Sequence, residues 1–329
     1  MQNGFFSTRS GRLTIWLVGL IAFAALLSIP TWVNSYQQFV VNLALVYVLV
    51  ALGFNMVIGY LGQLAFANAA FFGIGAYATG IAMAKFNIPF LGALCLSAVI
   101  GAICGVLVGL PALRGIRRFY LAIMTMAAGE LMRWTYIHAE SLTNGSTGLE
   151  VPPVIIFGNH IHSQESKFYL FLCIVIPLVW LVRNLVRSRV GRAIVAIRES
   201  ELAAAGNAIP TASYFVFTFG LSGMLVGVGG SLFAVEIGRV VPESFNLVQL
   251  IQQFAMVMVG GLGSIAGSAI GAAVIVAIPE LTRGYPGMEE LLFSLILIAV
   301  ILFMPSGLVG VGAKYLRLPT GGLFRGFKK

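Results

Sequence analysis

The sequence contains no aspartate, and only 9% of its 329 residues are charged. Soluble domains carry roughly 25% charged residues, so this composition excludes a soluble protein. Without aspartate the chain cannot form an aspartyl-phosphate. It also has neither the G-x-x-x-x-G-K-[ST] loop that cradles nucleotide phosphates nor an H-E-x-x-H zinc pair. We find no Ser-His-acid set either, so the chain is predicted to be no enzyme and to bind no cofactor itself.

Cysteine and histidine are scarce, at three residues each. Cys95, Cys104 and Cys173 lie inside apolar runs, which predicts buried small hydrophobic side chains rather than a disulfide framework. His160 and His162 have no third ligand, so they are expected to be solvated loop residues and no metal site is predicted.

The chain contains long apolar runs and few charged residues. Its residues are 59% hydrophobic and its mean hydropathy is +0.97. Continuous apolar stretches of about 20 residues predict an all-α, polytopic helical membrane protein, whereas a transmembrane barrel would show alternating polar positions. We expect one membrane-spanning domain over residues 1–329. Spans are expected near 13–30, 39–58, 64–84, 90–110, 119–138, 168–185, 212–235 and 289–311.

Most of the lysines and arginines lie in four short segments: the two termini, residues 111–118 and residues 183–198. Short Lys/Arg-rich loops stay on the cytoplasmic side, so both termini are predicted to be cytoplasmic, which requires an even number of spans. Residues 249–281 then form either two short spans or a re-entrant hairpin, which gives 8–10 transmembrane segments. The loop 139–167 is expected outside. Because topology explains the basic residues, no nucleic-acid partner is predicted.

Two glycine-rich stretches interrupt the apolar runs. GYLGQLA (59–65) and GGLGSIA (260–266) share the pattern G-x-L-G-[QS]-[LI]-A, as two copies of a repeat or by chance. Clustered glycine favours an interrupted or re-entrant helix. The backbone groups that a break frees must face protein or a water-filled cavity. Gln63 and Asn68 therefore either line a translocation path or hydrogen-bond a neighbouring helix.

Two charged side chains lie close to a predicted span. Glu130 and Arg133 are three residues apart and so share one face of a helix. An unpaired charge in the middle of the bilayer costs about 2.5–3.5 kcal/mol. The spacing therefore favours a local ion pair at the interface, with a gating or substrate role as the alternative.

Residues 188–210 form a charged stretch between two predicted spans. An apolar stripe on a short helix is predicted from Ile194, Ile197 and Leu202. Such a helix either lies on lipid headgroups or docks to a protein. Glu199 and Glu201 would be repelled by an anionic leaflet, which favours docking.

Five motifs occur in one order between about residues 40 and 310. They are GYLGQLAFANAAFFGIGAY (59–77), RRFYLAIMTMAAGELMR (117–133), LTNGSTGL (142–149), GRAIVAIRESELAAAGNAI (191–209) and MVMVGGLGSIAGSAIGAAVIVAIPE (256–280). Together they resemble the integral-membrane permease subunits of bacterial branched-chain amino acid ABC transporters, of the longer, LivM-like kind.

The resemblance implies the permease subunit of an ATP-driven importer of branched-chain or related amino acids. This subunit forms half of the translocation pathway in the bacterial cytoplasmic (inner) membrane. The implied partners are a second homologous permease subunit, two cytoplasmic ATPase subunits that bind ATP and Mg²⁺, a periplasmic substrate-binding protein and the lipid bilayer. One alternative is a permease of the same family for urea, short amides or other small polar solutes. The other is an ion-coupled secondary transporter, whose titrating carboxylate would be Glu130 or Glu280.

Residues 191–209 resemble the EAA-type coupling element of these permeases, which inserts into a groove of the ATPase subunit. The residues that this resemblance places on the ATPase-coupling surface are Arg192, Arg198, Glu199, Glu201, Ala203, Ala204 and Gly206. The family usually has glycine where this chain has Ala208, so the turn after the coupling helix departs from the family. The loop motif at 142–149 is implied to face the binding protein. The predicted translocation path comprises Gln63, Asn68, Phe72, Glu130 and Phe254.

Overall fold

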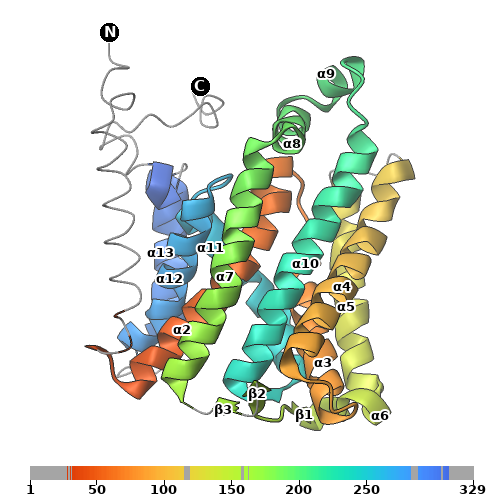
Figure 1. Cartoon of the computed structure of the whole chain (residues 1–329). Coiled ribbons are helices and arrows are strands. Elements are labelled where there is room, and N and C mark those ends of the chain that lie inside the picture. Colours follow the sequence, from red (N-terminus) through yellow and green to blue (C-terminus); the bar gives the residue numbers. More distant parts are fainter. Residues whose placement is uncertain are drawn as a thin grey trace, which may run out of the picture.

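The computed structural model describes residues 28, 30, 32–114, 119–156, 159–161, 163–282, 288–304 and 307–310 (Figure 1). The helices are α2 (Ser35–Asn55), α3 (Asn68–Ala84), α4 (Phe90–Gly109), α5 (Phe119–His138), α6 (Glu140–Thr143), α7 (Gln164–Arg187), α8 (Arg189–Glu199), α9 (Glu201–Gly206), α10 (Thr211–Ile237), α11 (Leu247–Gly260), α12 (Ile265–Thr282) and α13 (Met288–Phe303). A π-helix, η1 (Met56–Leu61), extends α2, and the 3-10 helices are η2 (Leu110–Arg114), η3 (Gly145–Thr147) and η4 (Pro242–Phe245). The strands are β1 (Leu149–Glu150), β2 (Val154–Ile156), β3 (Asn159–Ile161) and β4 (Arg239–Val240). The all-α polytopic class is therefore confirmed.

The long helices stand side by side and define two ends of the molecule (Figure 1). One end, here called the α8 end, carries α8 and α9. The opposite end, the β1 end, carries α6 and the short strands. There β1 pairs antiparallel with β4, which places Leu149 opposite Val240, and β2 pairs with β3. The described part of loop 139–167 lies at the β1 end, away from the arginines of α8.

Among the described residues, four helical segments are long and apolar enough to cross a membrane: Ser35–Leu61, Phe90–Leu113, Gln164–Arg187 and Thr211–Ile237. Shorter apolar helices cover Asn68–Ala84, Leu247–Gly260, Ile265–Glu280 and Leu291–Val300. Residues 249–281 thus fall on two separate helices, α11 and α12, which pack against each other. The predicted span 13–30 lies almost wholly outside the described residues.

Helix α10 is the centre of the bundle and packs against α2, α3 and α4. Its close approach to α3 depends on glycine, because a Cβ atom on Gly75 would overlap the backbone of Gly227. Gly101 of α4 and Gly223 of α10 face each other in the same way. Small residues at helix crossings let backbones approach closely, which explains why glycine is so frequent in these apolar segments.

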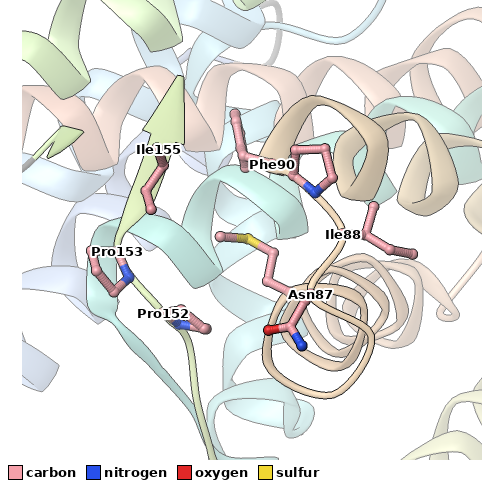
Figure 2. Close-up of a pocket in the computed structure, with 8 residues that line it drawn as sticks. Asn87, Ile88, Phe90, Pro152, Pro153 and Ile155 are labelled. Carbon is pink, nitrogen blue, oxygen red and sulfur yellow. The ribbon is translucent and has the colours of Figure 1, made fainter. Parts of the chain in front are cut away.

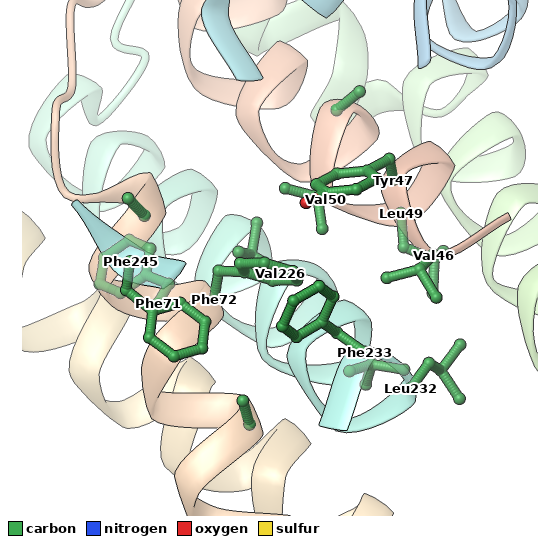
Figure 3. Packing of buried hydrophobic residues seen from close by; sticks show 14 of the residues in the cluster. Val46, Tyr47, Leu49, Val50, Phe71, Phe72, Val226, Leu232, Phe233 and Phe245 are labelled. Atoms are coloured by element: carbon green, nitrogen blue, oxygen red, sulfur yellow. The ribbon is translucent and has the colours of Figure 1, made fainter. Parts of the chain in front are cut away.

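The buried core lies where α2, α3 and α10 meet (Figure 3). The Phe72 ring packs 4.8 Å from that of Phe233 and 5.5 Å from that of Phe245. Tyr47 of α2 adds a ring 5.7 Å from Phe72. Large aromatic side chains supply much of the contact area in such a core, so α3 is held firmly beyond its first turn.

The prediction of buried cysteines is wrong. Cys95 and Cys173 are exposed on the outer faces of α4 and α7, and Cys104 is half-buried. In an apolar helix, periodicity alone does not separate a face that touches lipid from one that touches protein, because both carry apolar side chains.

Candidate functional site

The first helix break follows η1 and has a clear local cause. Gly62 has φ +74°, in the left-handed region that glycine adopts readily, and it ends the helix. Residues 62–67 then run without regular structure until α3 begins at Asn68. The Gln63 N–H donates to the Val57 carbonyl across the turn at 3.1 Å. The glycine-rich motif therefore interrupts a membrane helix, and α3 begins four residues later than the predicted span.

The second glycine motif also ends a helix and also contains a left-handed glycine. Helix α11 ends at Gly260, and Gly263, which matches Gly62 in the motif, has φ +72°. Here the chain turns at once into α12. The shared conformation at matching positions supports the interpretation of the two motifs as copies of one repeat. It also shows where they diverge, because only the first is followed by an extended segment.

The two breaks meet at the α8 end, where Asn55 holds them together. Its side-chain Nδ2 donates to the Ser264 carbonyl at 3.0 Å and to Ser268 Oγ at 2.8 Å, and its Oδ1 accepts from the Gly263 N–H at 2.9 Å. The Asn55 side chain is fully buried. Gly59 lies against both Asn55 and Gly263, since a Cβ on Gly59 would overlap Asn55 Oδ1 and the Gly263 nitrogen. The end of α2–η1 and the α11–α12 turn therefore form one hydrogen-bonded joint.

A second polar contact links the two interrupted helices deeper in the bundle. Asn68, the first residue of α3, donates from Nδ2 to Gln253 Oε1 of α11 at 2.8 Å, and both side chains are buried. Asn68 Oδ1 and Gln253 Nε2 have no hydrogen-bond partner among the described residues. The extended segment is held from α5, because the Phe66 N–H donates to Thr125 Oγ1 at 2.9 Å.

The other residues of the predicted path are not brought together. Gln63 is buried at the α8 end, Phe72 lies in the aromatic core, and Phe254 packs edge-on to Phe54 at 6.3 Å. Glu130 is exposed and pairs with Arg133 at 2.9 Å, as the spacing predicts. A small cavity of about 20 Å³ separates Glu130 from the starts of α3 and α11, which is room for roughly one water molecule.

Helices α8 and α9 each begin after a serine that caps the N-terminus. The Ser188 Oγ accepts from the Val190 N–H at 3.1 Å, and the Ser200 Oγ accepts from the Ala203 N–H at 3.3 Å. The new helix beginning after Ser200 breaks the predicted stripe: Ile194 and Ile197 are buried against η1, but Leu202 is 88% exposed.

The predicted coupling residues divide into two groups by exposure. Arg192, Glu199, Ala203 and Gly206 are exposed, Glu201 and Arg198 are half-buried, and Ala204 is buried. Arg198 turns inward, and its guanidinium donates to the Gly59 carbonyl. Burial lowers the pKa of the Arg198 guanidinium, and the neighbouring Glu199 carboxylate acts in the opposite direction. The exposed group is placed to meet a partner, whereas Arg198 contacts the joint.

The departure from the family at Ala208 has a visible consequence. Ala208 has φ +58°, the left-handed conformation that costs a residue with a Cβ roughly 1–2 kcal/mol. We expect Ala208→Gly to raise the free energy of unfolding of the purified chain by about 0.5–1 kcal/mol. The relief of backbone strain in the folded chain outweighs the greater conformational freedom of the unfolded chain. Ala208→Val is the matched control and should lower stability. A decrease with Ala208→Gly in a melting experiment would contradict this geometry.

Two larger cavities lie at opposite ends. The cavity at the α8 end, of about 330 Å³, is bounded by Gln63, Phe119, Arg198, Glu199 and Glu201 among others. The cavity at the β1 end, of about 390 Å³, lies between the α3–α4 turn and the chain around Pro152 and Pro153 (Figure 2). None of the eight described side chains that line this second cavity is charged. These side chains therefore offer no ion-pair partner to the charged groups of an amino acid.

Several buried polar side chains were not predicted from the sequence, among them Asn55, Gln253 and Glu236. Asn55 stands alone in the apolar run GFNMV, and Gln253 is one of two adjacent glutamines in IQQFA; amides within apolar runs were the available signal. Glu236 lies in the last turn of α10, one residue beyond the predicted span, and its side chain is fully buried.

The fold and these contacts define a multi-pass helical membrane protein with two interrupted helices joined at one end. A family model described as branched-chain amino acid transport system / permease component matches residues 36–305. The chain belongs to this family.

Several curated proteins are similar to this chain. The high-affinity branched-chain amino acid transport system permease protein LivM of Salmonella typhimurium is 27% identical over 93% of this chain and 77% of its own length. LivM of Escherichia coli K12 matches to the same extent. The permease protein LivH of Salmonella typhimurium is 26% identical over 82% of this chain and 93% of its own length. No solved structure matches the chain.

Proposed function

We propose that this chain is the permease subunit of an ATP-driven importer of branched-chain or related amino acids. The observation that carries the proposal is the joint beneath α8, where both interrupted helices are in contact with the segment expected to dock to an ATPase. The names of the related permeases support the substrate class. ATP hydrolysis and Mg²⁺ binding belong to separate subunits.

The charge distribution supports the orientation of the subunit. The arginines of residues 183–198 lie at the α8 end, and Lys/Arg-rich loops remain cytoplasmic. The exposed residues Arg192, Glu199 and Ala203 then face the cytosol and form the docking surface for an ATPase subunit. The β1 end faces the periplasm, where the substrate-binding protein delivers its ligand.

A second permease subunit would complete the path. The outer face of α5 exposes large apolar side chains, among them Tyr120, Ile123 and Trp134, and the same helix carries the exposed Glu130–Arg133 pair. An ion pair beside an apolar face suits a protein neighbour better than lipid, where a charged residue is costly. The small cavity at Glu130 lies between this face and the starts of α3 and α11.

Within this subunit the Asn68–Gln253 pair is the polar group best placed on the path. It joins the two interrupted helices, and it retains one hydrogen-bond acceptor, Asn68 Oδ1, and one donor, Gln253 Nε2. An amino acid presents an ammonium donor and a carboxylate acceptor, so the pair is complementary to both of its charged ends. Gln63 lies nearer the cytoplasmic exit.

We expect Asn68→Leu to abolish most ATP-driven uptake in the assembled transporter, measured with radiolabelled leucine in proteoliposomes. This substitution also leaves the buried Gln253 amide unpaired, at a cost of about 1–3 kcal/mol. The double variant Asn68→Leu/Gln253→Met removes that cost and serves as the control for folding. If the amides only pack, the double variant recovers both stability and uptake; if they line the path, it recovers stability alone. Gln63→Leu, which is independent of the pair, should reduce uptake as well.

A further inference from the structure

Arg198 belongs to the predicted coupling surface, and its side chain reaches both helix breaks. Its guanidinium donates to the Gly59 carbonyl in the first motif. In the second motif, a Cβ atom built on Gly263 would lie 3.2 Å from Arg198 Nη1 and 3.3 Å from the Gly59 carbonyl oxygen. The guanidinium is therefore lodged between the two glycine turns.

The aliphatic part of the same side chain covers the left-handed glycine of the first break. A Cβ on Gly62 would lie 2.7 Å from Arg198 Cγ. A residue larger than glycine at position 62 would force the Arg198 side chain to shift, in addition to straining the backbone. Glycine at position 62 therefore provides both the left-handed backbone conformation and the space that the Arg198 side chain occupies.

The helix that carries Arg198 is fixed to the same place. Ile194 and Ile197 of α8 are buried in a cluster that includes Val57, Tyr60 and Leu61 of η1. On the same helix, the side chains of Arg189, Arg192 and Glu199 are exposed. Helix α8 therefore has an outer face available for docking and an inner face attached to the joint.

We propose that Arg198 is the positioning residue that transmits movement of α8 to both interrupted helices at once. It is hydrogen-bonded to the Gly59 carbonyl and packs against Gly62 and Gly263. Movement of α8 therefore displaces residues 62–67, and with them α3, together with the α11–α12 turn. The planar guanidinium with five N–H donors can serve two backbone turns, whereas a lysine ammonium at the end of a flexible stem cannot hold both in fixed geometry. Asn55 keeps the two turns together, so that they move as one body.

This inference rests on the proposed function, since it presumes that an ATPase subunit moves α8. The test therefore uses the assembled transporter with both permeases, the ATPase subunits and the binding protein. We expect Arg198→Lys to retain assembly and ATP hydrolysis but to lower uptake per ATP hydrolysed by about tenfold, within the roughly 5–150-fold range of allosteric couplings. Arg189→Lys is the matched control, because Arg189 is exposed on the same helix and lies outside the proposed docking surface. It should couple like the wild type.

A distance measurement separates transmission from docking. In a variant lacking Cys95, Cys104 and Cys173, spin labels at positions 262 and 91 report the movement of the α11–α12 turn relative to the far end of α4. ATP binding should change this distance in the wild type. In Arg198→Lys the change should be far smaller, although the ATPase subunits remain bound.

Three results would overturn the inference. Wild-type coupling and wild-type label movement in Arg198→Lys would show that the arginine transmits nothing. Loss of the ATPase subunits from Arg198→Lys, but not from Arg189→Lys, would place Arg198 in the docking surface instead. If Arg198→Lys fails to fold, Arg198→Gln, which keeps one donor for Gly59, takes its place, and normal coupling in that variant contradicts the inference. Absence of ATP-driven uptake by the wild-type complex would instead remove the proposed function.

Discussion

Replacing Lys167 by methionine is expected to destabilise the isolated chain by about 3–5 kcal/mol. The Lys167 ammonium lies 3.6 Å from a carboxylate oxygen of Glu236 and donates to the Glu236 backbone carbonyl at 3.3 Å. Asn42 Nδ2 approaches the other carboxylate oxygen at 3.4 Å and donates to the Gln164 side chain at 2.9 Å. Removing the lysine leaves a fully buried carboxylate without its charge partner, at the point where α2, α7 and α10 are joined.

The measurement is the fraction unfolded in mixed micelles as denaturing detergent is added. Arg133→Met is the matched control, because it removes the cation of an exposed ion pair, and it should cost at most about 1 kcal/mol. The double variant Lys167→Met/Glu236→Gln should be close to the wild type, since no uncompensated charge remains. Equal losses in Lys167→Met and Arg133→Met would show that the buried pair contributes no more than a surface pair.

The second large effect is expected at Gly75, where even alanine should be poorly tolerated. A Cβ at this position would overlap the carbonyl of Gly227, and neither backbone can move aside without separating α3 from α10. We expect Gly75→Ala to cost about 3 kcal/mol, at the upper end for overpacking, because no side-chain rotamer change relieves the overlap.

Gly129→Ala is the control for Gly75→Ala. It lies in the helix α5, and its added Cβ would meet only the Phe66 carbonyl oxygen at an ordinary distance of 3.5 Å. This variant should be neutral or stabilising by up to about 1 kcal/mol, because alanine favours a helix more than glycine does. Detergent unfolding of both variants checks the pair of predictions, and a stable Gly75→Ala protein would contradict the observed helix crossing.

The helices themselves were predictable because apolar length is a strong signal. Spans 90–110 and 119–138 agree closely with α4 (Phe90–Gly109) and α5 (Phe119–His138). The break at GYLGQLA was also predictable, since clustered glycine weakens a helix wherever it occurs. The ion pair between Glu130 and Arg133 followed from their spacing alone.

Contacts between distant segments were not predictable in this way. Asn55 and Ser268 are separated by more than two hundred residues, and no local pattern indicates that they bond. The inward turn of Arg198 depends on how α8 rests on η1, which the resemblance to a coupling element does not specify. A new helix begins after Ser200 and separates Leu202 from the stripe of Ile194 and Ile197. This break depends on the N-cap at Ser200, which was not predicted.

The alternative of an ion-coupled secondary transporter needs a carboxylate within the membrane that gains and loses a proton or binds a cation. Glu130 is paired with Arg133 and exposed. Glu280, the other predicted carboxylate, is half-buried, and its Oε2 has no hydrogen-bond partner among the described residues. Glu236, which the sequence did not indicate, is fully buried and is already compensated by Lys167. A carboxylate held by a fixed ammonium suits a structural tie between helices better than an ion-coupling site.

Uptake by proteoliposomes is the measurement that tests the central proposal most directly. The chain is reconstituted with its second permease and ATPase subunits, and the binding protein and radiolabelled leucine, isoleucine or valine are supplied outside, with urea and short amides as competitors. The account predicts uptake that requires internal ATP and the binding protein, that is lost when this chain is omitted, and that urea does not inhibit. Uptake by this chain alone, driven by an ion gradient and indifferent to ATP, would contradict it.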